Sequence, residues 1–110
     1  NIDIKIRQIH RFHHHDEKNF IEKREKIMEI RQLETFVHVA QLQSFSRAAE
    51  VLGYTQSAIT VQIRLLENEL ETRLFDRTGK RVVLTPSGKE FMEHASRILY
   101  DVNKAKKVNE

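Results

Sequence analysis

A polar arc within residues 56–70 carries side chains that can hydrogen-bond to the edges of nucleobases. At about 100° per residue, the arc consists of Gln56, Thr60, Arg64 and Glu67, with Ser57 and Val61 at its margin. Glutamine pairs well with adenine, hydroxyl groups suit several base edges, and an apolar side chain such as Val61 can touch the methyl group of thymine. The arc therefore predicts base contacts in a DNA major groove. The alternative is an ordinary amphipathic surface helix.

A basic segment follows this arc. It contains Arg73, Arg77, Lys80, Arg81 and Lys89, with Asp76 as the only acid among them. The whole chain of 110 residues is nearly balanced, with 19 Lys and Arg against 16 Asp and Glu. Local positive charge in a near-neutral chain predicts an edge that faces a polyanion, whereas a solvated surface loop is the alternative. Arg77, Lys80 and Arg81 suit phosphate oxygens or a narrow minor groove.

Little else in the sequence predicts chemistry. The chain has no cysteine, which excludes disulfides, thiolate catalysis and cysteine-ligated metals and fits a reducing cytoplasm. His10, His13 and His14 lie in a tag-like stretch where no physiological metal site is expected. We find no nucleophile–base pair or glycine-rich phosphate loop, so no catalytic residue, cofactor or metal is expected. No apolar run approaches the roughly 18 residues of a membrane span.

The chain divides near Met28. Residues 1–27 lack a coherent hydrophobic pattern, and the run from Arg24 to Met28 could be encoded by a purine-rich ribosome-binding sequence followed by a start codon. We therefore hypothesise that Met28 is the natural initiator and that residues 1–27 are a non-native or poorly ordered leader. A true N-terminal extension that lengthens the first helix is the alternative.

Helical periodicity begins at Ile30. The expected packing face of the first helix consists of Ile30, Leu33, Phe36, Val37 and Ala40. Ser44 and Ser46 offer capping oxygens for a short second helix that ends at Gly53. Thr55 is the expected N-cap of the third helix, whose apolar stripe consists of Ile59, Ile63, Leu66 and Leu70.

A hairpin and a last helix follow. Residues 74–84 have the pattern of strand, tight turn and strand, which we call the wing. Thr85 and Pro86 then start a helix that can run to about Val108. The order predicts a mainly α fold, a winged helix–turn–helix with a two-stranded β-hairpin. We expect a DNA-binding domain over 28–85 and a linker or dimerisation helix over 86–110.

The last helix carries a seam for assembly. Its apolar residues, spaced 4, 3, 4, 3, are Phe91, Ala95, Ile98, Val102 and Ala105, with Leu99 beside them. This spacing is typical of a two-helix coiled coil and predicts a homodimer, parallel or antiparallel. Such a dimer would match a palindromic operator. The alternative, that the face folds back on its own domain, is strongest for Phe91.

Residues 28–97 resemble the N-terminal DNA-binding domain of LysR-type transcriptional regulators. The shared segments are Leu33…Phe36, Ser46-Arg47-Ala48-Ala49-Glu50-Val51-Leu52, Thr55-Gln56-Ser57-Ala58-Ile59-Thr60, Ile63-Arg64-Leu65-Leu66-Glu67, Leu74-Phe75-Asp76-Arg77 and Leu84-Thr85-Pro86-Ser87-Gly88. Two positions depart from the family. Thr60-Val61 stands where the family often has Ser-Arg, which implies one basic contact fewer, and Glu71 stands where a glycine usually ends the third helix.

The resemblance implies sequence-specific binding of double-stranded DNA. It implies base and backbone contacts from Gln56, Ser57, Thr60 and Arg64, backbone contacts from Ser46 and Arg47, and wing contacts from Arg77 and Arg81. Such regulators are typically much longer, form dimers or tetramers, and carry an effector-binding domain that is absent here. The chain is then a fragment or a naturally short relative. A winged-helix module that binds another protein is the competing function.

Overall fold

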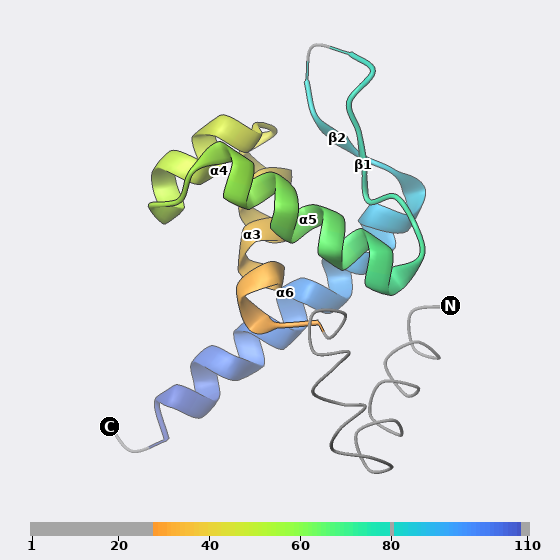
Figure 1. The fold of residues 1–110 in the computed structure, drawn as a ribbon. Helices are drawn as coiled ribbons and strands as arrows, with labels where there is room; N and C mark the ends of the chain where they lie inside the picture. The colour runs from red at the N-terminus through yellow and green to blue at the C-terminus, as the bar shows by residue number, and fades with distance from the viewer. Residues whose placement is uncertain (1–27, 80, 109–110) are drawn as a thin grey trace, which may run out of the picture.

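The computed structural model describes residues 28–79 and 81–108, so the expected leader, 1–27, lies outside the described residues. The elements, in order, are α3 (Ile30–Leu42), α4 (Phe45–Leu52), α5 (Gln56–Leu70), β1 (Phe75–Asp76), β2 (Val83–Leu84) and α6 (Pro86–Lys106). This order confirms the predicted winged helix–turn–helix (Figure 1). No helix in the described ranges is long and apolar enough to cross a membrane.

Side-chain caps begin the helices where the sequence predicts them. Ser44 Oγ accepts a hydrogen bond from the Arg47 N–H at 3.1 Å, and Thr55 Oγ1 accepts one from the Ala58 N–H at 3.1 Å. Gly53 ends α4 in the left-handed conformation, with φ of 75°. These local signals set the lengths of α4 and α5, and with them the turn between the two helices.

Two helices end in the left-handed conformation without a glycine. Gln43 closes α3 and Glu71 closes α5, each with φ of 54°. The Glu71 N–H bonds the carbonyl oxygens of Glu67 and Asn68, so α5 ends at the position where the family usually has glycine. The departure at Glu71 therefore leaves the end of the third helix in place.

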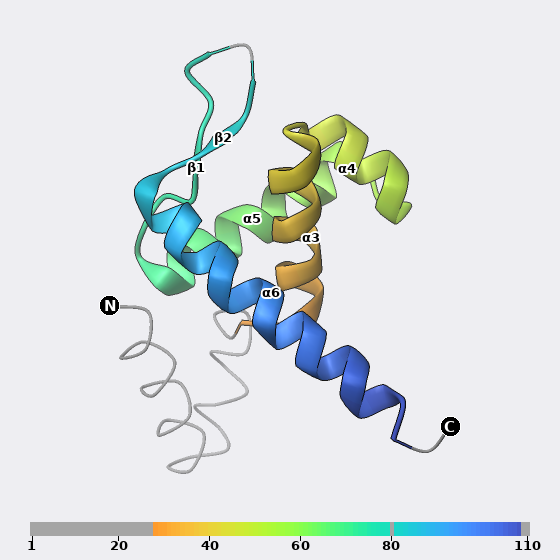
Figure 2. The same ribbon diagram turned by 180° about the vertical axis from the view of Figure 1, so that it is seen from behind.

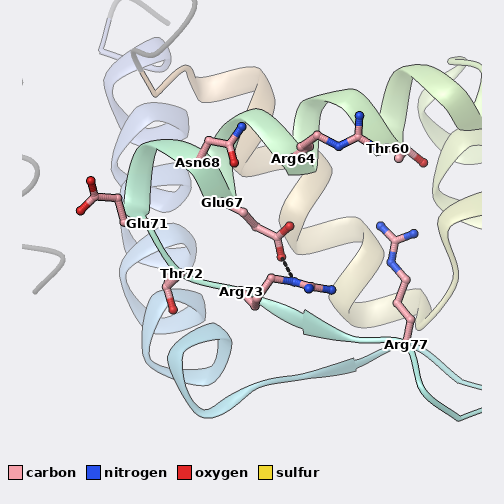
Figure 3. A pocket seen from close by; sticks show the side chains of 8 residues that line it. All are labelled: Thr60, Arg64, Glu67, Asn68, Glu71, Thr72, Arg73 and Arg77. Carbon is pink, nitrogen blue, oxygen red and sulfur yellow. Dashed lines mark ion pairs between the residues drawn. The ribbon is translucent and has the colours of Figure 1, made fainter.

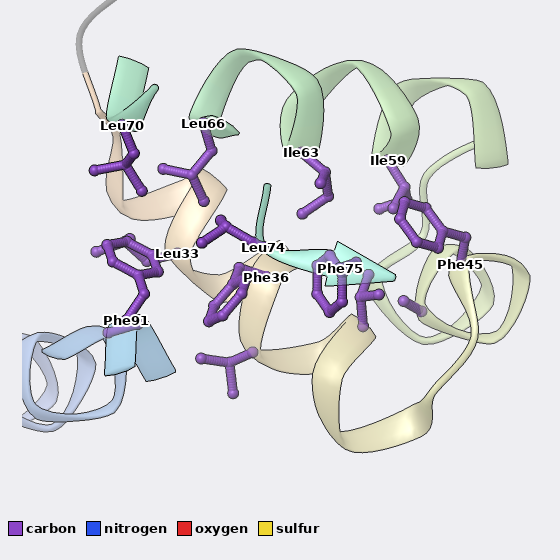
Figure 4. Packing of buried hydrophobic residues seen from close by; sticks show 14 of the residues in the cluster. Leu33, Phe36, Phe45, Ile59, Ile63, Leu66, Leu70, Leu74, Phe75 and Phe91 are labelled. Carbon is purple, nitrogen blue, oxygen red and sulfur yellow. The ribbon is translucent and has the colours of Figure 1, made fainter. Parts of the chain in front are cut away.

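The core lies between α3, α4, α5, β1 and α6, and three phenylalanines form its centre (Figure 4). The Phe36 ring centroid lies 5.3 Å from that of Phe75 and 5.1 Å from that of Phe91. Most of the predicted face of α3 is buried here, but Ile30, its first residue, is 40% exposed. The rings join helices that are distant in the sequence into one body.

The wing is a short antiparallel hairpin. Phe75 pairs with Leu84 and Asp76 with Val83, and the connecting loop extends beyond the helices (Figure 1). Phe75 is 2% exposed, so the base of the hairpin is anchored in the core while its loop is not.

The first half of α6 belongs to the domain core. Phe91 and Ala95 have no exposed surface in the single chain, so both residues, which the sequence analysis assigned to the dimer seam, pack in the chain's own core. The core thus continues past residue 85, the expected domain boundary. Ile98 and Leu99 are partly buried against it, Val102 is half-buried and Ala105 is exposed. The C-terminal end of α6 extends away from the body (Figure 2).

Candidate nucleic-acid interface

Helix α5 presents the predicted polar arc to solvent. Its apolar stripe, Ile59, Ile63, Leu66 and Leu70, is at most 5% exposed. On the other side Gln56, Ser57 and Arg64 are exposed, and Thr60 is half-buried. Val61 is 48% exposed, which leaves an apolar side chain among polar ones on the surface. The structure therefore brings all five predicted contact residues of this helix to one accessible face.

The hydroxyl groups on this face already take part in hydrogen bonds. Thr60 Oγ1 donates to the Gln56 carbonyl oxygen at 3.1 Å, and Ser57 Oγ lies 3.2 Å from Thr55 Oγ1. A threonine hydroxyl has one proton, so Thr60 offers an external partner only its lone pairs. Thr60 is thus suited to accept a hydrogen bond from an amino group.

The start of α4 forms a second accessible feature. Ser46 and Arg47 are exposed in its first turn. Ser44 Oγ lies 3.1 Å from Ser46 Oγ as well as capping the helix. The partial positive charge of a helix N-terminus attracts anions, and the Arg47 guanidinium adds a full charge to it.

A groove of about 670 Å³ lies between α5 and the base of the wing (Figure 3). Its lining residues are Thr60, Arg64, Glu67, Asn68, Glu71, Thr72, Arg73 and Arg77. Arg64 and Arg77, which the sequence predicts as contacts, thus share one groove although they come from different elements. Arg73 and Asn68 also line it, and the sequence analysis did not single them out as site residues. Arg73 belongs to the basic segment, which was the available signal.

Glu67 joins the two walls of this groove. Its carboxylate accepts a hydrogen bond from the Leu74 N–H at 2.8 Å and lies 3.9 Å from Arg73 Nε. The side chain of Glu67 is 16% exposed, whereas that of Arg73 is 75% exposed. The sequence places Glu67 on the polar arc, but its contact is with the chain entering β1. Glu67 therefore fixes the wing relative to α5.

The wing residues differ in their surroundings. The Arg77 guanidinium lies 3.7 Å from the centroid of the Phe45 ring, at the start of α4. Arg81 is exposed, and Lys80 lies outside the described residues. Asp76 accepts hydrogen bonds from the N–H and the hydroxyl of Thr78. These bonds, the backbone one first, lower the pKa of Asp76 below its usual value. Its carboxylate thus holds the turn after Arg77.

Candidates for catalysis or metal binding are weak among the described residues. His38 Nδ1 lies 2.8 Å from the Glu34 carbonyl oxygen of its own helix. Between residues 28 and 108, Lys80 aside, no group of three or more His, Asp or Glu is placed to hold a metal ion. His10, His13 and His14 lie outside the described residues.

Comparison with known proteins gives consistent matches. The family model described as bacterial regulatory helix-turn-helix protein, lysR family, matches residues 30–89. The chain is 47% identical over 79 residues to the transcriptional dual regulator GltC of Bacillus subtilis, covering 72% of this chain and 26% of GltC. It is 44% identical over 81 residues to the HTH-type transcriptional regulator CzcR of the same organism, covering 74% of this chain and 28% of CzcR.

Solved structures are similar as well. The BenM DNA-binding domain in complex with benA site 1 DNA has a TM-score of 0.72 and 36% identity, covering 74% of this chain and 92% of that one. Vibrio fischeri DarR in complex with DNA has a TM-score of 0.70 and 38% identity, covering 72% of this chain and 27% of DarR. The present chain spans between 26% and 28% of the length of the curated relatives named above.

Proposed function

Because this chain belongs to the lysR family of bacterial regulatory helix–turn–helix proteins, we propose that it binds a specific sequence of double-stranded DNA as the DNA-binding part of a transcriptional regulator. The observation that carries the proposal is the accessible polar face of α5, which shares a groove with the arginines at the base of the wing. A bacterial regulator of this kind acts on the chromosome in the cytoplasm.

Helix α5 enters the major groove with its N-terminal half. Gln56, Ser57, Thr60 and Val61 contact base edges there, since their side chains are accessible and suited to hydrogen bonds or to a thymine methyl group. Arg64 lies further along the helix and contacts the DNA backbone. The unusual Thr60-Val61 pair makes this part of the reading surface less basic than in many relatives.

Backbone contacts come from two flanking elements. Ser46 and Arg47 at the start of α4 bind a phosphate through the helix N-terminus and the guanidinium. Arg77 and Arg81 of the wing contact phosphates or the minor groove. For Lys80 in the wing loop, the proposed contact with phosphates or the minor groove rests on the sequence alone. We assign no catalytic role, cofactor or metal to the chain.

The protein acts as a homodimer through the second half of α6. The proposed contact residues are Ile98, Leu99, Val102 and Ala105. Phe91 and Ala95 are left out of this set because they are buried in the core of the single chain. A two-fold dimer places two recognition helices on one duplex and matches a palindromic operator. In a full-length regulator the dimers pair to form a tetramer, and an inducer-binding domain outside this chain controls them.

Salt dependence tests DNA binding against protein interaction. Fluorescence anisotropy with a random duplex should give an affinity that falls with added salt, by a log–log slope of about 0.9 per phosphate contact. Arg64→Ala should weaken binding and lower this slope by about one. The control is Arg31→Ala, which removes the same charge from an exposed position on α3. Absence of duplex binding at low salt, or equal effects of both variants, would contradict the proposal.

A further inference from the structure

An aromatic platform lies beneath the first arginine of the wing. The Arg77 guanidinium carbon is 3.7 Å from the centroid of the Phe45 ring. Phe45 is only 5% exposed, and its ring packs edge-on against Phe75 with centroids 5.8 Å apart. The platform is therefore fixed in the core, while Arg77 is exposed above it.

The distance also restricts how the guanidinium is oriented. A guanidinium nitrogen that pointed at the ring would come within about 2.4 Å of its centre, given a C–N bond of about 1.33 Å, which is too close for contact. A planar group that lies across the ring avoids this approach, and such stacking is the usual arrangement of a guanidinium on an aromatic face. Its N–H donors lie in that plane and point sideways, where they remain available to an anion.

The stack connects three elements of the proposed interface. Phe45 is the first residue of α4, next to Ser46 and Arg47. Arg77 directly follows β1 and lines the same groove as Arg64 of α5, as Figure 3 shows. The neighbouring Asp76 carboxylate accepts its hydrogen bonds from Thr78. The Arg77 guanidinium is thus held over a ring at the start of α4, beside the groove that α5 lines.

We infer that Phe45 is a positioning residue for DNA binding, which holds the Arg77 guanidinium in its phosphate-binding orientation before DNA arrives. This inference rests on the proposed function. A free arginine side chain loses much rotamer freedom when it binds, and an arginine already ordered on a ring loses less. The attraction between a guanidinium and an aromatic face supplies the ordering.

A double-mutant cycle tests the coupling. Phe45→Leu keeps an apolar side chain in the core but removes the ring, and we expect it to weaken duplex binding threefold to tenfold. In an Arg77→Ala background the same change should cause no further loss, because the side chain it positions is gone. Affinities are measured by anisotropy, with the folded fraction of each variant checked by circular dichroism.

The matched control is Phe36→Leu. Phe36 is fully buried in the same core and its ring contacts Phe75 and Phe91. The Phe36→Leu substitution should lower the melting temperature while leaving the duplex affinity of the folded protein unchanged. Loss of affinity from Phe45→Leu that is equal in both Arg77 backgrounds, or no loss at all, overturns the inference.

A measurement without substitution covers the case in which Phe45→Leu does not fold. In the free wild-type protein, the Arg77 side-chain protons should be shifted upfield by the ring current of Phe45, relative to those of exposed Arg31. Arg77 resonances at ordinary positions overturn the inference. The two failures are distinguishable. If the proposed function is wrong, Arg77→Ala leaves duplex affinity unchanged. If Arg77→Ala lowers duplex affinity but shows no coupling to Phe45→Leu, only the positioning role is rejected.

Discussion

Thr60 illustrates how the helix itself restricts base recognition. Because its hydroxyl donates to the Gln56 carbonyl oxygen at 3.1 Å, it meets a base as an acceptor. On the proposed interface it therefore favours the amino groups of adenine or cytosine. Val61 is 48% exposed and offers a thymine methyl group an apolar contact. Gln56, one turn earlier, is the side chain best able to discriminate by paired hydrogen bonds.

Replacement of Gln56 tests base readout. Gln56→Ala should cost about 1–3 kcal/mol on the specific site and little on random duplex, since a base contact discriminates among sequences and a phosphate contact does not. The specific site is first obtained by binding-site selection, and both affinities are then measured at one salt concentration. Arg64→Ala is the comparison, because it should weaken both duplexes alike. Equal losses from Gln56→Ala on both duplexes would reassign Gln56 to the backbone.

Sequence analysis could assign roles to residues whose interaction partners lie close to them along the chain. Ser44 and Thr55 cap helices through contacts three residues away, so their roles follow from spacing alone. The Phe45–Arg77 stack and the Glu67–Leu74 bond were missed. The partners in the stack are brought together only by the tertiary fold, and a glutamate on a polar arc has the pattern of any solvated residue.

At the scale of elements, the wing and α6 are fastened to each other around Leu74. The Leu74 carbonyl oxygen accepts from the Thr85 N–H at 3.0 Å, while Thr85 Oγ1 donates to the Arg73 carbonyl oxygen at 2.6 Å. Gly88 allows this approach, because a Cβ built there would lie 2.2 Å from the Leu74 oxygen. Any larger residue must push α6 away from the base of the wing.

Substitution of Gly88 tests this junction. Gly88→Ala should destabilise the fold by about 1–3 kcal/mol, as expected for overpacking against backbone, and so lower the melting temperature by several degrees. The control is Gly79→Ala in the wing loop, where a Cβ would have no neighbour within 4 Å. Thermal unfolding followed by circular dichroism measures both. A Gly88→Ala protein as stable as Gly79→Ala would show that the junction is looser than described.

The seam of α6 marks a limit of pattern analysis. Its apolar residues have one continuous spacing, which predicts a partner helix but not which helix that is. In the structure Phe91 and Ala95 face the protein's own core, Ile98 and Leu99 are partly buried against it, and the C-terminal end of the helix extends beyond it. The winged architecture was predicted because each element has its own periodicity and caps. Which residues of α6 pack on the core and which remain for a partner depends on how far the core extends along the helix. No local sequence pattern contains this information.

For the whole molecule, the arrangement of α5 and α6 decides how a dimer can meet DNA. The second half of α6 leaves the body on the side away from the wing (Figures 1 and 2). A contact there leaves both the recognition face and the wing free. Half-sites of an operator lie about 34 Å apart, or multiples of this distance, so in the proposed dimer the geometry of the α6 contact sets the spacing that is recognised.

Charges on the α6 seam should separate the two subunits. Ile98→Asp with Val102→Asp buries two carboxylates in the contact, which is costly without partners, so the variant should be a folded monomer that binds the palindromic site far more weakly. The control is Ser96→Asp with Tyr100→Asp, which adds the same charge at exposed positions that lie about 120° or more around the helix from Ile98 and Val102. Sedimentation velocity measures assembly and circular dichroism checks folding. A wild-type chain that sediments as a monomer at tens of micromolar would refute the dimer.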